Sequence, residues 1–139
     1  MPTTQTDARE FAVEVAQLMS DLKCEDVIVL DVRGLSQVTN FVIIGTGTSE
    51  RQMRSVGEDI GELGQDHGHD VFRANQDRSS NWVIVDFVDV TAHLFEPNSR
   101  AFYDLEHLWA DAPRIQWRRE RPSRASKRDD DAGPAQPDA

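Results

Sequence analysis

The residues that most invite a chemical role lie at 45–49, in the stretch Gly45-Thr46-Gly47-Thr48-Ser49. An expected strand precedes this stretch and an expected helix follows it, and backbone amides at such a helix N-terminus can bind an anion such as a phosphate. A Walker loop would continue with Gly-Lys-Ser/Thr, and a dinucleotide-binding loop would need glycine where Glu50 stands. A nucleotide-binding or nucleotidyltransferase-like function for this loop therefore stays an alternative that lacks its usual motif.

Other polar residues are candidates for a metal site or a catalytic site. Nucleotidyl transfer needs two or three carboxylates on neighbouring strands to hold magnesium, whereas Asp86 and Asp89 are expected to point apart in a hairpin. His67 and His69 lie near an expected helix end, where a solvated turn is more usual than a metal site. His93 with Asp86 suits acid–base work, but no Ser or Cys nucleophile is paired with them. We therefore predict a protein that is not an enzyme, with no catalytic residues, no metal and no cofactor.

Length and charge limit the class of protein. The 139 residues, of which 38% are hydrophobic, suit one folded domain, which we place at residues 1–110. These residues hold 8 Lys+Arg and 19 Asp+Glu, a net charge of −11, so phosphate backbones repel them and we expect little direct nucleic-acid contact. A basic protein is a better electrostatic match. Residues 111–139 carry a net charge of +1 and several prolines, and they are expected to form a disordered tail.

The sequence also indicates the compartment. Cys24 is the only cysteine, which excludes a disulfide within the chain and a zinc site built from cysteines. No apolar run approaches the ~20 residues of a membrane helix, and the polar N-terminus lacks the pattern of a leader peptide. We therefore expect a cytoplasmic protein without membrane contact.

Apolar periodicity predicts the elements that position these residues. Helices are expected over 7–22, 49–66 and 100–109, and strands over 27–32, 41–44, 71–72, 82–87 and 90–95. Asp7 with Glu10 and Ser49 with Gln52 have the spacing of helix caps. The order predicts an α/β (α+β) fold, in which a single mixed sheet of about five strands has its helices packed mainly on one face.

The hairpin over 82–95 has two different faces. With a two-residue turn at Val88-Asp89, Phe87 lies opposite Val90, and alternate residues share a face. One face is wholly apolar and is assigned to the core: Val83, Val85, Phe87, Val90, Ala92 and Leu94. The other face carries Trp82, Ile84, Asp86, Thr91, His93 and Phe95. Aromatic and polar side chains together on an outer face indicate a partner site, unless a helix or the C-terminal tail covers that face.

Five segments in this order resemble the ribosomal silencing factor (Iojap-like) family. They are Val29-Leu30-Asp31-Val32-Arg33-Gly34-Leu35-Ser36, then Phe41-Val42-Ile43-Ile44 with the 45–49 loop, then Asn81-Trp82-Val83-Ile84-Val85-Asp86, then Asp89-Val90-Thr91-Ala92-His93-Leu94-Phe95, then Phe102-Tyr103-Asp104-Leu105-Glu106 with Leu108-Trp109. The resemblance covers roughly residues 8–109. It implies a fold similar to a minimal nucleotidyltransferase without the catalytic carboxylates.

The resemblance also implies a function. A member of this family would bind the large ribosomal subunit through the ribosomal protein numbered fourteen, sterically block joining of the subunits and repress translation when nutrients are short. Its partner-facing patch would be Trp82, Asp86, Phe87, Asp89 and His93, although face parity places Phe87 inside. A homodimer is also implied, for which the mixed hairpin face or a ridge of glycines at 57, 61 and 64 is a candidate surface.

Two positions depart from the family's pattern. Val88 stands where glycine is usual, and a left-handed backbone there is unfavourable for a β-branched side chain, so a longer or different turn is an alternative. Asn40 stands where aspartate is usual.

Overall fold

Five strands form one mixed sheet at the centre of the computed structural model, which describes residues 7–75 and 81–119. They are β1 (Glu25–Asp31), β2 (Phe41–Thr46), β3 (Arg73–Asn75), β4 (Trp82–Asp86) and β5 (Val90–Phe95), in the spatial order β1-β2-β5-β4-β3. The β2–β5 pair is parallel and the other pairs are antiparallel. The expected mixed five-stranded sheet is confirmed.

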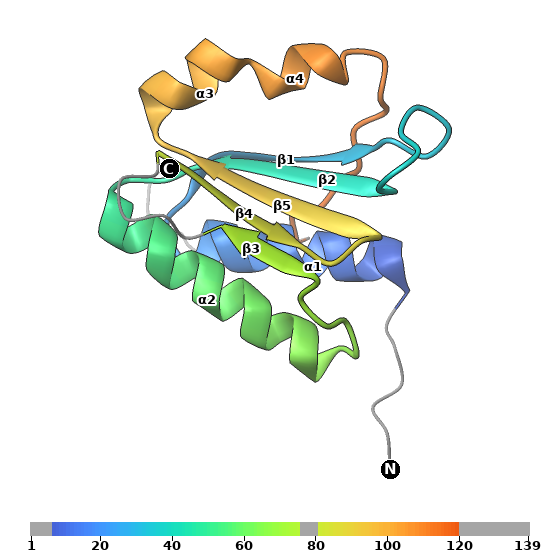
Figure 1. Ribbon diagram of the computed structural model, residues 1–139, viewed down its shortest axis with the longest axis horizontal. Coiled ribbons are helices and arrows are strands. Elements are labelled where there is room, and N and C mark those ends of the chain that lie inside the picture. The colour runs from blue at the N-terminus through green and yellow to red at the C-terminus, as the bar shows by residue number, and fades with distance from the viewer. Residues whose placement is uncertain (1–6, 76–80, 120–139) are drawn as a thin grey trace, which may run out of the picture.

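Two long helices cover one face of the sheet and two short helices lie over the other (Figure 1). The long ones are α1 (Ala8–Asp21) and α2 (Glu50–Asp66), and the short ones are α3 (Pro97–Tyr103) and α4 (Leu105–Leu108). Asp7 caps α1 by accepting from the Glu10 amide, as predicted. Ser49 caps α2 in the same way, which gives each long helix a fixed start.

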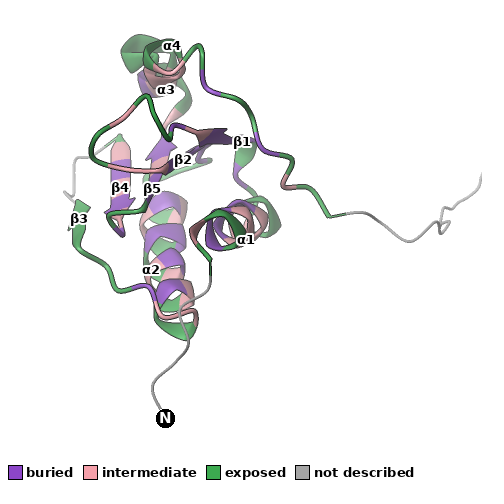
Figure 2. Cartoon of the chain, turned by 90° about the vertical axis from the view of Figure 1, so that its right-hand side faces the viewer, coloured by how far each residue is buried: buried purple, intermediate pink, exposed green. Residues whose placement is uncertain are grey.

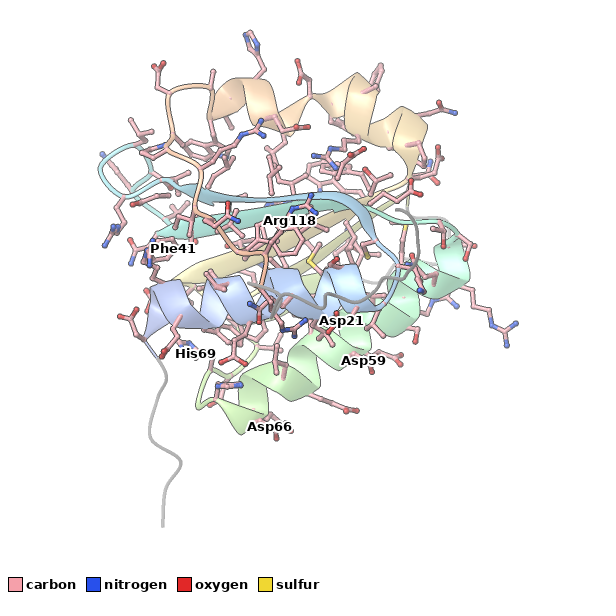
Figure 3. The ribbon with its side chains drawn as sticks, turned by 180° about the vertical axis from the view of Figure 1, so that it is seen from behind. Asp21, Phe41, Asp59, Asp66, His69 and Arg118 are labelled. Carbon is pink, nitrogen blue, oxygen red and sulfur yellow. The ribbon has the colours of Figure 1, made fainter. Side chains whose placement is uncertain are left out.

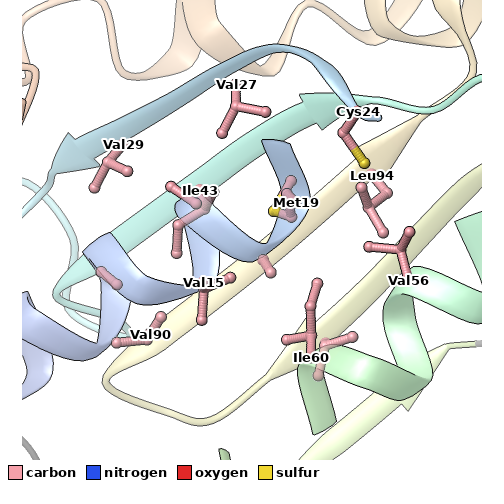
Figure 4. Close-up of a cluster of buried hydrophobic side chains, with 14 of the residues drawn as sticks. Val15, Met19, Cys24, Val27, Val29, Ile43, Val56, Ile60, Val90 and Leu94 are labelled. Carbon is pink, nitrogen blue, oxygen red and sulfur yellow. The ribbon is translucent and has the colours of Figure 1, made fainter. Parts of the chain in front are cut away.

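The main core lies between α1, α2 and the sheet (Figure 4). Val15 and Met19 of α1 meet Ile43 of β2, and Ile60 of α2 is fully buried on the same side. All six residues of the predicted inward hairpin face are buried in this core. The alternation read from the sequence therefore assigned the core face of the hairpin correctly.

The hairpin has the predicted register, with Trp82 opposite Phe95 and Asp86 opposite Thr91. The Phe87 amide donates to the Val90 carbonyl over 2.8 Å, so the turn holds two residues. Val88 adopts a φ of +77°, a left-handed backbone that β-branched residues rarely accept. The longer turn considered for Val88 is wrong, and the strained valine is held in place instead.

The last predicted helix is broken in two. Asp104, with a φ of +47°, separates α3 from α4. Leu105 and Trp109 pack against the sheet, whereas Phe102 is 80% exposed and Leu108 is 66% exposed. The single continuous helix expected over 100–109 is therefore wrong.

The C-terminal segment after α4 packs along the outer edge of β1 (Figure 2). The Asp31 amide donates to the Pro113 carbonyl and the Ile115 amide donates to the Val29 carbonyl. Ile115 is buried, and the Trp117 indole donates to the Val27 carbonyl over 2.9 Å. The domain boundary expected at residue 110 is therefore too early, because this segment covers an otherwise open sheet edge. Residues 120–139 of the expected tail lie outside the described residues.

Two smaller expectations also change. The short strand expected at 71–72 is β3, two residues later, and it is exposed along its length. On the glycine ridge of α2, a Cβ at Gly64 would lie 2.6 Å from the His69 carbonyl oxygen and closer still to the Phe87 ring. At Gly64 this ridge, a candidate dimer surface, is thus approached closely by Phe87 and by the segment that follows the helix in the same chain.

Candidate partner-binding site

A groove of about 860 Å³ lies on the outer face of the hairpin. Ile84 and His93 line its floor, and Leu105 and Trp109 form the wall on the side of α4. Three exposed apolar side chains stand at its rim: Val38 (80% exposed), Phe72 (68%) and Val88 (47%). A mostly apolar hollow with a few polar groups is the usual character of a binding site, and exposed apolar side chains gathered in one place mark an interaction surface.

The predicted outer face is therefore partly covered and partly open. Phe95 is fully buried beneath Trp82 and Tyr103, with ring centroids 4.9 Å and 6.2 Å away. Thr91 is buried beside Thr39, whose hydroxyl lies 3.1 Å from its own. The α3–α4 unit thus closes one end of this face, and the groove occupies the remainder. A helix therefore covers part of this face, as one alternative allowed, and a role of the open part in partner binding stays a prediction.

Asp86 stabilises the hairpin turn. Its Oδ1 accepts from the Val88 amide over 2.8 Å and its Oδ2 accepts from Arg73 over 3.3 Å. The first bond holds the left-handed Val88 in place, and the side chain of Asp86 is only 15% exposed. Asp89 is exposed in the turn, while its carbonyl accepts from the amides of Asn40 and Phe41. Asp89 places negative charge at the turn end of the groove, whereas the charge of Asp86 is paired with that of Arg73.

Trp82 and His93 form a hydrogen-bonded pair on neighbouring strands. The indole Nε1–H of Trp82 donates to Nδ1 of His93 over 3.1 Å. The His93 ring is partly buried and also stacks on Phe95, with 9° between the planes. Burial lowers the pKa of His93 to about 4, and the nearby negative charge of Asp86 only partly offsets this. The imidazole is therefore neutral at physiological pH.

Phe87 does not belong to this surface. It is 5% exposed and packs in the main core, where its ring meets that of Phe11 edge-on with centroids 5.0 Å apart. The placement of Phe87 in the partner-facing patch is therefore corrected, as its parity in the strand already indicated. Of the other four predicted residues, Asp86 and His93 line the groove, Asp89 stands beside it in the turn, and Trp82 supports His93 from the closed end.

Several residues of the groove were not identified from the sequence. Val38 belongs to the loop between β1 and β2, Phe72 belongs to the connection from α2 to β3, and Arg73 begins β3. Backbone bonds from Asn40 and Phe41 to Asp89 bring that loop beside the hairpin turn. Exposed apolar residues within polar loops were the available signal, but only the tertiary fold shows that they share one rim.

Hydrogen bonds and close contacts within the chain use the backbone of the loop at 45–49. The Gly47 amide donates to the Phe95 carbonyl over 2.8 Å, and the Thr48 amide donates to Oε1 of Gln52 over 3.0 Å. A Cβ at Gly45 would lie 2.5 Å from the Met19 methyl group, which accounts for a glycine there. Two of the amides that would hold a phosphate are therefore used already, and this geometry does not favour the nucleotide-binding alternative.

The two histidines after α2 also have structural partners. His69 is 3% exposed and stacks on Phe11, with ring centroids 4.3 Å apart, so it is a core residue rather than part of the solvated turn expected from the sequence. His67 lies 3.3 Å from a carboxylate oxygen of Glu14. Among residues 7–75 and 81–119, no group of three or more potential ligands is placed to hold a metal ion.

Much of the acidic charge lies on the two long helices, on the opposite side of the sheet from the groove. Asp59 and Asp66 lie on α2 and Asp21 lies at the end of α1 (Figure 3). Arg119 pairs with Asp21 through two contacts of 3.1 and 3.2 Å, which fastens the C-terminal segment to α1. None of the helices in the described part of the chain has the length and hydropathy to cross a membrane.

Comparison with known proteins gives consistent matches. The family model described as "Ribosomal silencing factor during starvation" matches residues 5–139. Ribosomal silencing factors of Halalkalibacterium halodurans and Bacillus subtilis are each 34% identical over 98 residues, which are 70% of this chain and 84% and 83% of theirs. The crystal structure of a Chromobacterium violaceum protein has a TM-score of 0.72 at 30% identity, and the match covers 76% of this chain and 88% of that one. These matches show that the chain belongs to the ribosomal silencing factor family.

Proposed function

We propose that this protein binds the large ribosomal subunit through the ribosomal protein numbered fourteen and thereby blocks joining of the small subunit. The observation that supports this most is the groove on the hairpin face, rimmed by Val38, Phe72 and Val88. An apolar rim beside the exposed carboxylate of Asp89 suits a partner segment that presents apolar side chains within a basic surface.

The blocking mechanism follows from size and position rather than from chemistry. A folded body held on the joining face occupies the space that the small subunit needs, so translation is repressed when nutrients are short. This action needs no catalytic group, and we propose that the protein is not an enzyme. It would act in the cytoplasm, where ribosomal subunits meet, with little direct contact to ribosomal RNA because of its acidic body. The homodimer implied by the family stays a prediction.

Co-sedimentation with isolated ribosomal subunits tests the proposal. The wild type should pellet with large subunits and not with small ones. Val38→Lys places a positive charge at the groove rim and should reduce binding at least tenfold, because it would replace an apolar contact and set a cation against the basic surface of the partner. Phe102→Lys is the matched control, since Phe102 is equally exposed, at 80%, but lies on α3 outside the groove. Equal loss in both variants, or in neither, would contradict a role for the groove.

A further inference from the structure

We infer that His93 is a fixed hydrogen-bond donor of the groove, which Trp82 orients so that Nε2–H meets a neutral carbonyl oxygen of the bound partner. This inference rests on the proposed function and adds the chemistry by which the partner segment is recognised. It gives Trp82 a positioning role in place of the direct anchoring role that its residue type suggests.

The donor arrangement follows from one hydrogen bond. An indole N–H can only donate, so Nδ1 of His93, 3.1 Å from the Trp82 Nε1, must be the acceptor. A neutral imidazole carries its proton on the other nitrogen. Nε2 therefore bears the hydrogen, on the part of the ring away from Trp82, and His93 lines the groove. Among residues 7–75 and 81–119, no hydrogen bond from this nitrogen to an acceptor is present.

The position of Trp82 supports a positioning role. Its ring is only partly exposed and lies against Phe95 and Tyr103, with centroids 4.9 Å and 4.8 Å away. These contacts leave it at the closed end of the hairpin face, and it is not among the residues that line the groove. The indole is thus held by its neighbours and in turn holds His93.

The surroundings of Nε2 select the kind of acceptor. Asp86 acts electrostatically on the His93 ring, but its charge is paired with Arg73 over 3.3 Å, so a charged group of the partner finds no free counter-charge there. Burial keeps the His93 ring neutral, because its pKa is lowered to about 4. Val42 and Ile84 make the adjoining surface apolar. A neutral carbonyl oxygen, such as that of a main-chain peptide between apolar side chains, satisfies the donor without adding charge.

Two substitutions of His93 test its hydrogen-bond donor separately from the space that its side chain fills, and one substitution of Trp82 tests the positioning role. His93→Met keeps an apolar side chain and removes the donor, so affinity for isolated large subunits should fall roughly three- to tenfold. His93→Gln offers an amide N–H at a similar reach and should recover most of that loss. Trp82→Phe keeps the aromatic packing and removes the indole N–H, so it should weaken binding while leaving the thermal midpoint close to that of the wild type.

Nitrogen-15 NMR of the free wild type gives an independent readout. It should show His93 protonated on Nε2 alone, and in Trp82→Phe the two tautomers should mix. A wild type that fails to bind large subunits would overturn the proposed function and this inference together. A wild type that binds while His93→Met binds equally well would overturn the inference alone, as would a free protein whose His93 carries its proton on Nδ1.

Discussion

Substitution of His93 by glutamine should flatten the dependence of stability on pH. In the unfolded chain the imidazole takes up a proton near its ordinary pKa of 6.5, whereas burial in the folded protein lowers the pKa to about 4. Between these values the unfolded state binds more protons, so the free energy of unfolding falls as the pH falls. One pKa unit corresponds to about 1.4 kcal/mol, so the full difference is worth about 3 kcal/mol, of which about 2 kcal/mol is lost by pH 5.

Urea unfolding at a series of pH values from 7.5 to 5 measures this effect. The sequence pI of about 4.7 makes pH 5 a practical lower limit, because solubility is least near the pI. Asp31 and Glu106, whose pKa values are lowered by Arg33 and Arg100, are present in both proteins and cancel from the difference. The wild type should lose about 2 kcal/mol more than His93→Gln across this range. Parallel curves would refute the buried, neutral state of His93.

Two further predictions concern packing. Gly64→Ala should lower the free energy of unfolding by about 1–3 kcal/mol, because its Cβ would meet the Phe87 ring and the His69 carbonyl oxygen. Gly61→Ala on the same helix, where the Cβ meets only a Val71 methyl group at 3.5 Å, should leave stability unchanged or raise it by up to about 1 kcal/mol; the same sign for both would contradict this packing. Ile115→Ala should cost about 2–4 kcal/mol if the C-terminal segment packs on β1. Gln116→Ala, at the exposed neighbouring position, should cost less than about 0.5 kcal/mol, and equal small effects in urea unfolding would show that the segment is not docked.

The elements set by local periodicity were predictable from the sequence. Alternation along the hairpin placed Val85 and Leu94 inside and Ile84 and His93 outside, because a strand allows only two faces. The start of α1 was equally clear, since Asp7 has a side chain suited to cap it. These features depend on neighbours close in sequence, and an exclusively local pattern is sufficient to predict them.

Features that depend on distant parts of the chain were missed. The C-terminal segment reads as polar and charged, yet Ile115 and Trp117 are sufficient to dock it, because β1 offers an unpaired edge about ninety residues earlier. The helix break at Asp104 also depends on a contact distant in sequence. Arg100 bonds to Glu106 across the break, and it also donates to the Asp26 carbonyl, 74 residues earlier in the chain. Neither interaction leaves a periodic trace in the sequence.

The candidate site shows the same division. Asp86 and His93 were found because they share one face of the hairpin, whereas the rim residues Val38 and Phe72 come from separate loops that meet only in the folded protein. Phe87 was assigned to the surface by family resemblance against the parity of its strand, and parity was correct. A residue assigned to a partner surface from family resemblance should therefore also be checked for the exposure of its side chain.

The bound protein is proposed to keep the small subunit from joining the large one. Light scattering after mixing of purified subunits measures this directly, with the large subunit first saturated with the protein and its occupancy verified by sedimentation. Joining should be abolished by the wild type and by Phe102→Lys, and restored with Val38→Lys because that variant no longer occupies the large subunit. Joining at the unperturbed rate, on large subunits shown to carry the wild-type protein, would contradict obstruction by the bound protein.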